Sequence, residues 1–327
     1  MNSIKQLEQQ TTSSTQIPIL DFHQFIFSDF ASKQAIASEV LQTIEEVGCF
    51  YLKNCVPQNA IDQAFGNANG FFALPEAEKR QLAWKDGAAL GYFYTKYNGD
   101  FREAFVFGEA VLTDRIDTDS PVAQQVHQHL GHHPAFRDAV QQLFTACHDA
   151  GNRILKAIAI ALNLPESYFS DRHPQQADYG LLHRYYEVSE PPQPGEARFE
   201  EHTDWGSLSL LFQDENGGLE VCTNAGEWIA APPLPNTAIV FIADVMQRWT
   251  NDKFPATKHR VLMPANARSL PERYSLAFFL SPGDDTEIAC IENCLDAGES
   301  PKYTPILTKE YYKQKTEDLA KRFNGSK

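Results

Sequence analysis

The sequence predicts a mixed α/β (α+β) fold in which a jelly-roll β-core follows an N-terminal half rich in helices. From about residue 178 onward, short apolar runs alternate with Gly, Pro, Asn and Asp, as in a β-sandwich or barrel of the jelly-roll type. Before about residue 165, apolar residues recur every three or four positions, as on the buried side of helices. The hydrophobic fraction of 43% and the charged fraction of 22% are those of an ordinary globular protein.

The N-terminal stretch begins with a polar segment. Residues 1–15 are rich in Gln, Ser and Thr, so we expect a frayed start. Residues 17–21 (IPILD) predict a short strand. Ser32 can then cap a helix that Gly48 ends. The apolar side of this helix is predicted at Ile36, Val40, Ile44 and Val47.

Helices dominate the predicted elements that follow. Residues 49–52 (CFYL) predict a second strand, and residues 57–72 and 75–82 each predict a helix that starts at a proline. Residues 86–108 are rich in Gly, Tyr and Phe, so we expect an irregular segment of aromatic strands and turns. Helical spacing returns over residues 119–164.

The C-terminal half supplies the predicted β-core and a final charged helix at residues 307–323. No internal repeat and no long linker separates the two halves. We therefore expect an N-terminal module (16–165) and a jelly roll with its C-terminal helix (178–327) to pack as one unit. The apolar runs that predict its strands are residues 208–212, 218–221, 238–243, 259–262 and 274–280.

Charge and cysteine content restrict the classes of partner and the compartment. The chain has 28 basic and 43 acidic residues, a formal net charge of −15. Such a surface repels phosphate backbones and anionic lipid, so we expect no nucleic-acid or membrane partner. Separately, we expect a monomer or weak homo-oligomer. No stretch resembles a secretory signal or reaches the roughly 20 apolar residues that cross a bilayer. Six scattered cysteines without a Cys-x-x-Cys pair are typical of reduced thiols, which favours the cytoplasm.

The strongest chemical signal is His202-Thr-Asp204, followed about 55 residues later by His259. In a strand, residues two apart point to one face, so His202 and Asp204 can reach one metal. A jelly roll can bring His259 alongside them. Two imidazoles and a carboxylate form a facial triad with open positions, which favours Fe(II) over Zn(II). The alternative is chance, because His-x-Asp alone is a common pattern.

A second signal is Arg273-Tyr-Ser275, which lies inside an apolar run. On a strand the two polar side chains share one face. A buried arginine is costly unless an anion meets it, and its planar fork suits a carboxylate. The far carboxylate of 2-oxoglutarate fits this requirement while its keto acid chelates iron. A structural ion pair with an acid of the protein is the alternative.

Together these features resemble the isopenicillin N synthase-like family of Fe(II)/2-oxoglutarate-dependent dioxygenases over nearly the whole chain. The N-terminal half adds matches that support one another. In the C-terminal half the matching segments are residues 202–206 (HTDWG), 218–221 (GLEV), 249–251 (WTN), 259–261 (HRV) and 273–275 (RYS), with Trp228 and Asp244. In the N-terminal half they are residues 17–21, 46–54 (EVGCFYLKN) and 71–75 (FFALP), with Lys79.

The resemblance implies a distorted double-stranded β-helix that binds Fe(II), 2-oxoglutarate and O2, with ascorbate as a further reductant. It implies His202, Asp204 and His259 as iron ligands. It also implies Arg273, Ser275 and Tyr186 as the 2-oxoglutarate site. The expected activity is oxidation of an unactivated C–H bond of a small molecule by hydroxylation, desaturation or ring rearrangement. Succinate and CO2 are released, and specialised metabolism is the expected context.

Two departures from the family pattern bear on the subfamily rather than on the chemistry. Cys55 stands where many relatives have His, and Glu187-Val188 replaces a Pro-Pro pair. Aromatic walls with a few polar groups are typical of ligand pockets. The side chains that we expect to line the substrate pocket are Phe93, Tyr94, Tyr97, Arg102, Arg184 and Phe279.

The sequence also allows other interpretations of the metal site and of the function. The run His127-x-His129-x-x-His132-His133 could bind a metal, but it contains no acidic partner and is typical of a solvated helix end. A 2-oxoglutarate-independent iron oxidase, a non-catalytic small-molecule-binding module and a zinc hydrolase could each use the same fold and ligands. Succinate formation, oxygen consumption and activity without oxygen distinguish them.

Overall fold

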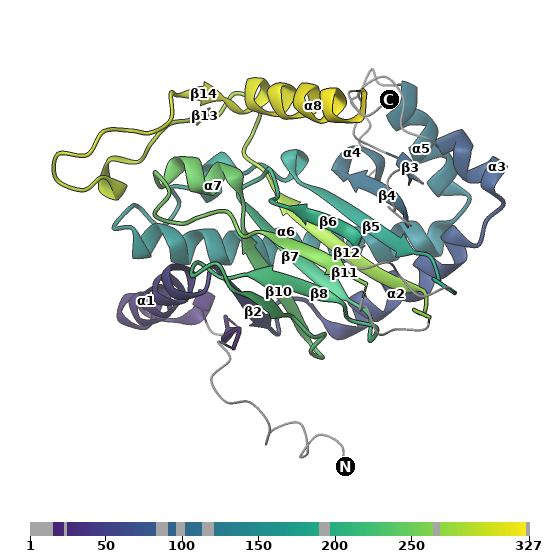
Figure 1. The fold of residues 1–327 in the computed structure, drawn as a ribbon, viewed down its shortest axis with the longest axis horizontal. Helices are drawn as coiled ribbons and strands as arrows, with labels where there is room; N and C mark the ends of the chain where they lie inside the picture. The colour runs from purple at the N-terminus through teal and green to yellow at the C-terminus, as the bar shows by residue number, and fades with distance from the viewer. Residues whose placement is uncertain are drawn as a thin grey trace, which may run out of the picture.

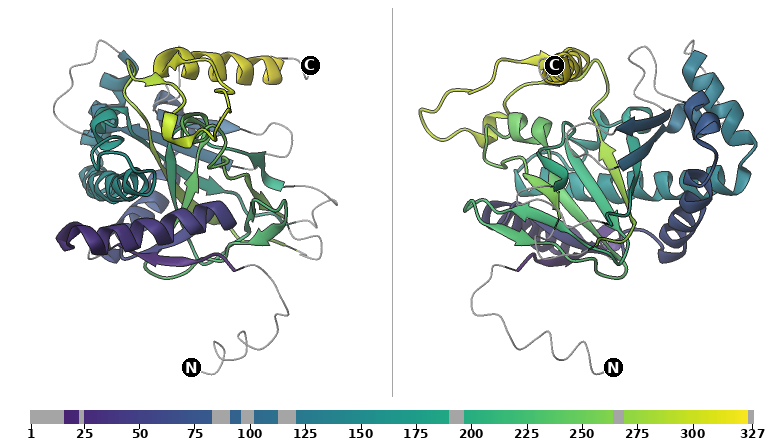
Figure 2. Two further views of the ribbon diagram at one scale, coloured as in Figure 1. Left: turned by 90° about the vertical axis from the view of Figure 1, so that its left-hand side faces the viewer. Right: turned by 45° about the vertical axis from the view of Figure 1, so that its right-hand side comes forward.

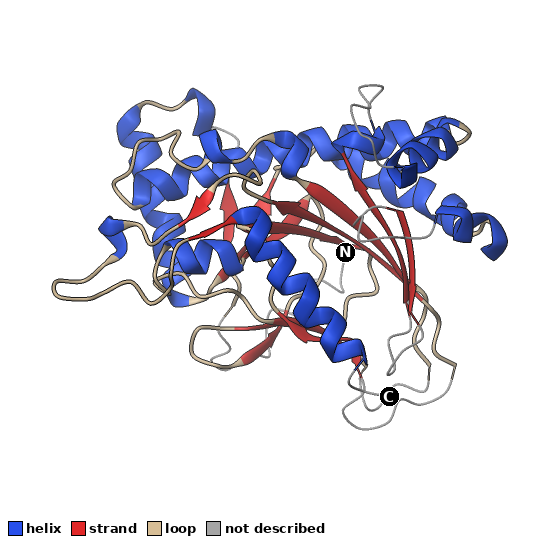
Figure 3. Cartoon of the chain, turned by 90° about the horizontal axis from the view of Figure 1, so that it is seen from above, coloured by secondary structure: helices blue, strands red, loops and turns tan. Residues whose placement is uncertain are grey.

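Two β-sheets packed face to face form the centre of the protein, and helices cover the outer side of the larger sheet (Figures 1 and 3). The structure is a computed structural model. It describes residues 16–22, 25–82, 91–95, 102–112, 121–189, 197–263 and 269–324. The predictions for residues 1–15 and for Tyr97 therefore lie outside the described residues.

The large sheet has eight strands within the described ranges, in the order β1-β2-β10-β7-β12-β5-β4-β3. β1 and β2 are parallel, and all other neighbours are antiparallel. The strands are β1 (Ile19–Asp21), β2 (Cys49–Lys53), β3 (Gly91–Thr95), β4 (Arg102–Gly108), β5 (Tyr179–Tyr185), β7 (Leu208–Gln213), β10 (Thr237–Ile242) and β12 (Arg273–Leu280).

The small sheet pairs four strands of the described chain in the order β6-β11-β8-β9, all antiparallel. The two facing sheets confirm the predicted jelly-roll core, a distorted double-stranded β-helix. Its strands are β6 (Ala197–His202), β8 (Leu219–Cys222), β9 (Trp228–Ala230) and β11 (His259–Leu262). A short hairpin, β13 (Glu287–Ile288) with β14 (Ile306–Leu307), leads into the last helix.

The helices account for most of the N-terminal half. α1, α2 and α6 lie along the outer face of the large sheet, and α8 crosses the opposite end of the molecule (Figures 1 and 3). The helices are α1 (Phe30–Glu46), α2 (Gln58–Phe72), α3 (Glu76–Lys79), α4 (Glu109–Leu112), α5 (Pro121–Gly131), α6 (Pro134–Ala161), α7 (Asp244–Trp249) and α8 (Thr308–Asn324). No described helix is long and apolar enough to span a membrane.

Side chains on the strands of the large sheet point alternately to its two faces, and this divides the core into two layers. On β12, Leu276 and Phe278 pack with the helices, whereas Ala277 and Phe279 face the small sheet. A strand that is buried on both faces reads as a continuous apolar run, which is why residues 274–280 were recognisable. The polar residues of this strand, Arg273 and Ser275, belong to the odd-numbered side, so they face the space between the two sheets.

Long α6 packs tightly on this sheet. A Cβ atom on Gly151, in the middle of the helix, would lie 2.3 Å from Leu280 Cδ2, so the missing side chain allows close approach. The predicted helical segment 119–164 is two helices, because Pro134 starts α6 after a short break at His132 and His133. Within residues 86–108 the described part consists of β3 and β4, the aromatic strands expected there, and they extend the large sheet.

Candidate active site

Three metal-ligating side chains meet at the open edge of the small sheet. His202 is the last residue of β6 and pairs with His259, the first residue of β11. Asp204 follows β6 by two residues and lies outside the strand. Its Oδ1 is 3.8 Å from Nε2 of each histidine, and all three ligand atoms lie within 4.8 Å of one another. The strand argument therefore holds for His202 alone, and a turn rather than a strand brings Asp204 to it.

Backbone carbonyls orient both imidazoles. His202 Nδ1 lies 2.8 Å from Glu200 O, and His259 Nδ1 lies 3.1 Å from Thr257 O. A carbonyl only accepts hydrogen bonds, so each Nδ1 carries a proton, and Nε2 is the nitrogen that holds the lone pair when the ring is neutral. Both lone pairs are then available to a metal beside Asp204.

The surroundings keep the His202 ring neutral and leave the cluster partly open. The side chains of Asp204 and His259 are 9% and 8% exposed, whereas His202 is 28% exposed. Desolvation, followed by the charge of His259, holds the pKa of His202 well below its usual range, so the ring stays in the metal-binding form. Phe241 stacks on His259 with ring centroids 4.3 Å apart, and Phe199 lies 4.1 Å from His202.

Arg273 and Ser275 lie on β12, and both are 1% exposed. Arg273 donates from Nε to Gly217 O over 2.6 Å and from Nη2 to Gln213 Oε1 over 2.9 Å. Its Nη1 is buried without a hydrogen-bond partner among the described residues. Neither acceptor is charged, so no structural ion pair of this arginine occurs in the described chain. A buried guanidinium with one unused donor is the arrangement that a ligand carboxylate would complete.

The comparisons with known proteins agree with this geometry. Residues 177–282 match the family described as the 2OG-Fe(II) oxygenase superfamily, and residues 17–129 match the non-haem dioxygenase N-terminal family. The 2-oxoglutarate-Fe(II) type oxidoreductase ppzD of Metarhizium majus is 30% identical, over 90% of this chain and 93% of its own length. The chain belongs to the 2-oxoglutarate–Fe(II) oxygenase family.

Two further relatives of this oxygenase support the assignment. The proline hydroxylase buaE of Petromyces alliaceus is 29% identical, over 90% of this chain and 96% of its own length. A Neurospora crassa protein solved in complex with alpha-KG and 5-formyluracil superposes with a TM-score of 0.79 at 30% identity, covering 91% of this chain and 95% of its own. The protein is therefore an enzyme that depends on Fe(II) and 2-oxoglutarate, as the sequence predicted.

The donor set of the oxygenase fits both groups. Two imidazoles and one carboxylate suit a ferrous ion with open coordination positions. The unused Nη1 of Arg273 suits the far carboxylate of 2-oxoglutarate.

A tyrosine that sequence reasoning missed also lies beside Arg273. Tyr185 pairs with Arg273 across β5 and β12, and the guanidinium carbon of Arg273 lies 4.8 Å from the Tyr185 ring centroid. Tyr186, the residue that the resemblance implied, lies just past the end of β5, and the Arg184 guanidinium lies over its ring at 5.5 Å. The residue-by-residue alternation of β5 could have indicated Tyr185, but only once its pairing with β12 is known.

Among the expected pocket residues, Arg102 is linked to the metal-ligand cluster through Phe199, which contacts His202. It is 8% exposed, and its guanidinium carbon lies 3.5 Å from the Phe199 ring centroid. Its Nη1 donates to His183 Nδ1 over 3.0 Å. Burial, followed by the charge of Arg102, holds the pKa of His183 well below its usual range, so His183 is a neutral acceptor.

The other expected pocket residues divide between the two faces of the sheet. Phe279 faces the small sheet and stacks on Tyr179 with centroids 4.7 Å apart. Phe93 on β3 is half-buried, and the Tyr94 side chain lies outside the described residues. Arg184 requires a correction. It points to the helix-covered face, where it binds Glu272 over 2.9 Å and Glu103 over 2.8 Å.

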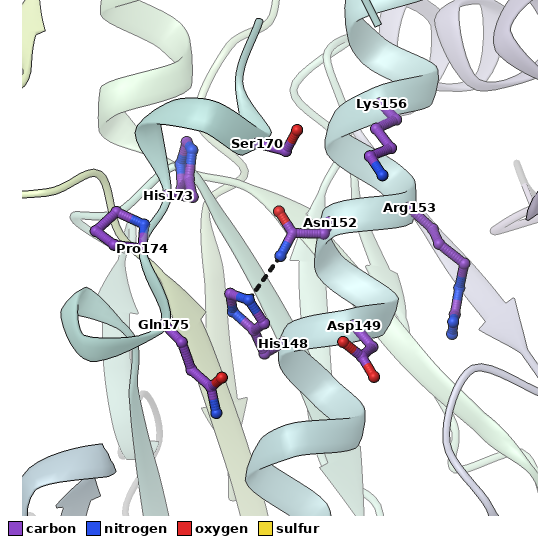
Figure 4. A pocket seen from close by; sticks show the side chains of 9 residues that line it. All are labelled: His148, Asp149, Asn152, Arg153, Lys156, Ser170, His173, Pro174 and Gln175. Atoms are coloured by element: carbon purple, nitrogen blue, oxygen red, sulfur yellow. Dashed lines mark hydrogen bonds between the residues drawn. The ribbon is translucent and has the colours of Figure 1, made fainter. Parts of the chain in front are cut away.

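The hollow in Figure 4 is separate from the cluster of His202, Asp204 and His259. Its lining comes from α6 and the turns that follow it, and no lining residue belongs to a strand. His148 donates from Nδ1 to Asp178 and accepts from Asn152 at Nε2, as Figure 4 shows for the second bond. The residues that line it are His148, Asp149, Asn152, Arg153, Lys156, Ser170, His173, Pro174 and Gln175.

Proposed function

We propose that this oxygenase holds Fe(II) with His202, Asp204 and His259, and holds the far carboxylate of 2-oxoglutarate with Arg273 and Ser275. The observation that carries the proposal is the unused, buried Nη1 of Arg273 on the sheet that faces the metal-ligand cluster. We also propose Tyr185 rather than Tyr186 as the aromatic neighbour of the cosubstrate, since its ring lies against the guanidinium of Arg273.

The chain's own residues prepare the site for oxidation of a C–H bond. The bound iron and 2-oxoglutarate supply the oxidising chemistry, in which O2 is consumed and succinate and CO2 are released. Glu200 O and Thr257 O fix the imidazole orientations. Phe199 and Phe241 exclude water from one side of the rings. The low exposure of Asp204 and His259 directs substrate to the side of His202.

For the substrate we propose a small molecule of specialised metabolism that carries a carboxylate or another strong acceptor. Arg102 supports this proposal because it places a buried positive charge against Phe199, which itself contacts His202. Phe279 and Tyr179 supply an apolar wall on the same side of the large sheet. The buaE relative is a proline hydroxylase, and proline is a small molecule that carries a carboxylate.

The cytoplasm remains the proposed compartment, and a monomer or weak homo-oligomer remains the proposed state. All six cysteines lie in described segments and all are free thiols, which supports a reducing environment. Hydroxylation, desaturation and ring rearrangement all remain proposed outcomes of the same site.

The proposal is tested first on cosubstrate binding. The protein is loaded anaerobically with Fe(II), 2-oxoglutarate is added, and the weak visible band of an iron-chelated keto acid is recorded. We expect the band in the wild type and its loss in Arg273→Ala at the same cosubstrate concentration. Arg260→Ala is the matched control, because that arginine is already paired with Glu220 at 2.8 Å. Iron binding without a band in the wild type would favour a 2-oxoglutarate-independent oxidase instead.

The ligand assignment has its own test. Asp204→Ala should abolish succinate formation and lower the iron content. Even the loss of a residue that only hydrogen-bonds a metal ligand lowers metal affinity or activity by about 10–100-fold. Full turnover with stoichiometric iron in this variant would remove Asp204 from the metal site.

A further inference from the structure

A second group of metal-ligating side chains lies where α3 meets the end of α5. Figure 1 and the right-hand view of Figure 2 show these two helices side by side at the edge of the molecule, beyond the large sheet. Glu78 Oε1 lies 4.0 Å from His129 Nε2 and 3.8 Å from His133 Nε2. The histidine run itself contains no acidic residue; its acidic partner comes from about 50 residues upstream.

The geometry of this second cluster matches that of the proposed iron site. Each consists of two imidazole Nε2 atoms and one carboxylate oxygen, all within 4.8 Å of one another. The carboxylate-to-nitrogen distances are 3.8 Å and 3.8 Å at Asp204, against 4.0 Å and 3.8 Å at Glu78. Spacing therefore gives no reason to treat the first as a metal site and the second as incidental.

An independent observation points to a ligand. His129 Nε2 is buried and has no hydrogen-bond partner among the described residues. Its side chain is 13% exposed. A buried polar atom without a partner is uncommon and costly. A cation bound between His129 and Glu78 would supply the missing partner.

The fold holds the two histidines in place before any metal binds. His129 lies in the last turn of α5, and His133 is the N-cap residue of α6. The intervening turn is closed by hydrogen bonds from His132 N to His129 O over 2.9 Å and from His133 N to Leu130 O over 3.0 Å. The two rings are tilted by 44° with centroids 5.0 Å apart, so they are not stacked on each other.

We propose that Glu78, His129 and His133 form a second site for a divalent transition-metal ion, with Zn(II) as its probe and water as the fourth ligand of that probe. Two histidines, one carboxylate and one water make a common four-coordinate zinc set. Zinc bonds of about 2.0–2.1 Å place neighbouring ligand atoms roughly 3.3 Å apart. Each carboxylate-to-nitrogen distance must then shorten by about 0.5–0.7 Å, and the Glu78 side chain, which is 38% exposed, is free to make that movement.

The site would fasten a helix that has few other anchors. α3 is four residues long, and on its inner side Lys79 donates to Glu103 over 2.6 Å and to Phe72 O over 2.8 Å. A metal on Glu78 anchors the outer side of the same turn to the junction of α5 and α6. The role of this metal is therefore structural. Its site is separate from the metal centre proposed at Asp204.

The test uses the full-length protein in an Asp204→Ala background, which weakens the first site. Zn(II) is titrated against a chromophoric chelator after the protein has been stripped of metal. We expect one remaining equivalent of tightly bound zinc, and an affinity at least tenfold weaker when Glu78→Gln or His129→Ala is added. Glu78→Gln alters an exposed side chain, so its result does not depend on the folding of the more buried histidine variant.

Two controls separate a built site from general attraction to an acidic surface. Glu76→Gln lies on the same helix, where it is exposed and paired with Arg80. His132→Ala removes an exposed neighbouring ring whose centroid is 6.5 Å from that of His129. We expect both to leave the zinc affinity within twofold. The proposal is overturned if Glu78→Gln binds zinc as tightly as its background, or if both controls weaken binding as much.

Discussion

Two arginines on opposite faces of the large sheet differ in what they bind, one of them fully buried (Arg273) and the other with 24% of its side chain exposed (Arg184). Arg184 faces the helices and lies between Glu103 and Glu272, with hydrogen bonds of 2.8 Å and 2.9 Å. Arg273 faces the small sheet, has only neutral partners, and keeps Nη1 free within the described chain. An arginine that is paired with acidic side chains of the same chain stabilises the fold. A buried arginine that has no acidic partner indicates a missing anionic ligand.

The strongest way to break this comparison is to remove the acid on the helix-covered face. Glu103 is fully buried and accepts hydrogen bonds from Lys79, Arg184 and Tyr92. Glu103→Gln leaves buried Lys79 without its anion and Arg184 with Glu272 alone, and we expect a loss of about 3–5 kcal/mol in the free energy of unfolding. Denaturant unfolding measures it, and cosubstrate affinity should be unchanged.

Arg273→Ala is the counterpart on the other face. This substitution removes a buried positive charge that no described acid neutralises. We therefore expect the free energy of unfolding to change by less than in Glu103→Gln. A larger loss of stability in Arg273→Ala would make that arginine a structural residue and would remove the distinction between the two faces.

A pH-dependent effect also belongs to the helix-covered side. Burial lowers the pKa of His173 to about 4, while both ring nitrogens are bonded, to Phe169 O over 2.7 Å and Ser207 Oγ over 2.8 Å. Between pH 6.5 and 4 the unfolded chain binds a proton here and the folded chain does not, so stability falls as pH falls. The contribution is about 3 kcal/mol across this window.

His173→Gln isolates this effect. Burial raises the pKa of Asp178 to about 6, which gives a slope of the opposite sign between about pH 4 and 6 in both proteins. Subtracting the free energy of unfolding of His173→Gln from that of the wild type at each pH removes the contribution of Asp178. We expect the wild type to lose stability relative to His173→Gln on acidification. Parallel curves from pH 7 to pH 4 would show that His173 does not titrate as stated.

The smallest expected effect concerns the two adjacent tyrosines. Tyr185→Leu removes the ring beside the Arg273 guanidinium, and we expect 2-oxoglutarate affinity to fall several-fold, since such a contact contributes about 1 kcal/mol. Tyr186→Leu should change it by less than twofold. Equal effects, or a larger effect at Tyr186, would restore the residue that the sequence resemblance implied. Anaerobic titration of the keto-acid band measures both variants.

The features that the sequence predicted are those that depend on patterns of residues close together in the chain. Period-two alternation placed Arg273 and Ser275 on one face of β12, and helical spacing found α1, α2 and α6. The metal-ligand cluster was predicted from a motif and from a family resemblance, although Asp204 reaches it from a turn. The fold class and the cofactors were predicted on the same basis.

What the sequence did not predict depends on contacts between distant segments. Glu103 and Glu272 lie about 80 to 90 residues from Arg184, so no local pattern showed that this arginine is paired. Glu78 and His133 are likewise joined only by the packing of α3 against the junction of α5 and α6. The choice between Tyr185 and Tyr186 depends on where β5 ends, and strand ends are set by pairing rather than by composition.

The central claim is that Arg273 recognises the far carboxylate of the cosubstrate. The most direct measurement is an anaerobic titration of the Fe(II) protein with 2-oxoglutarate and with 2-oxopentanoate, which keeps the keto acid but lacks that carboxylate. We expect the wild type to prefer 2-oxoglutarate by about 100-fold, and Arg273→Ala to bind both with similar affinity. A preference that survives in Arg273→Ala would contradict the account.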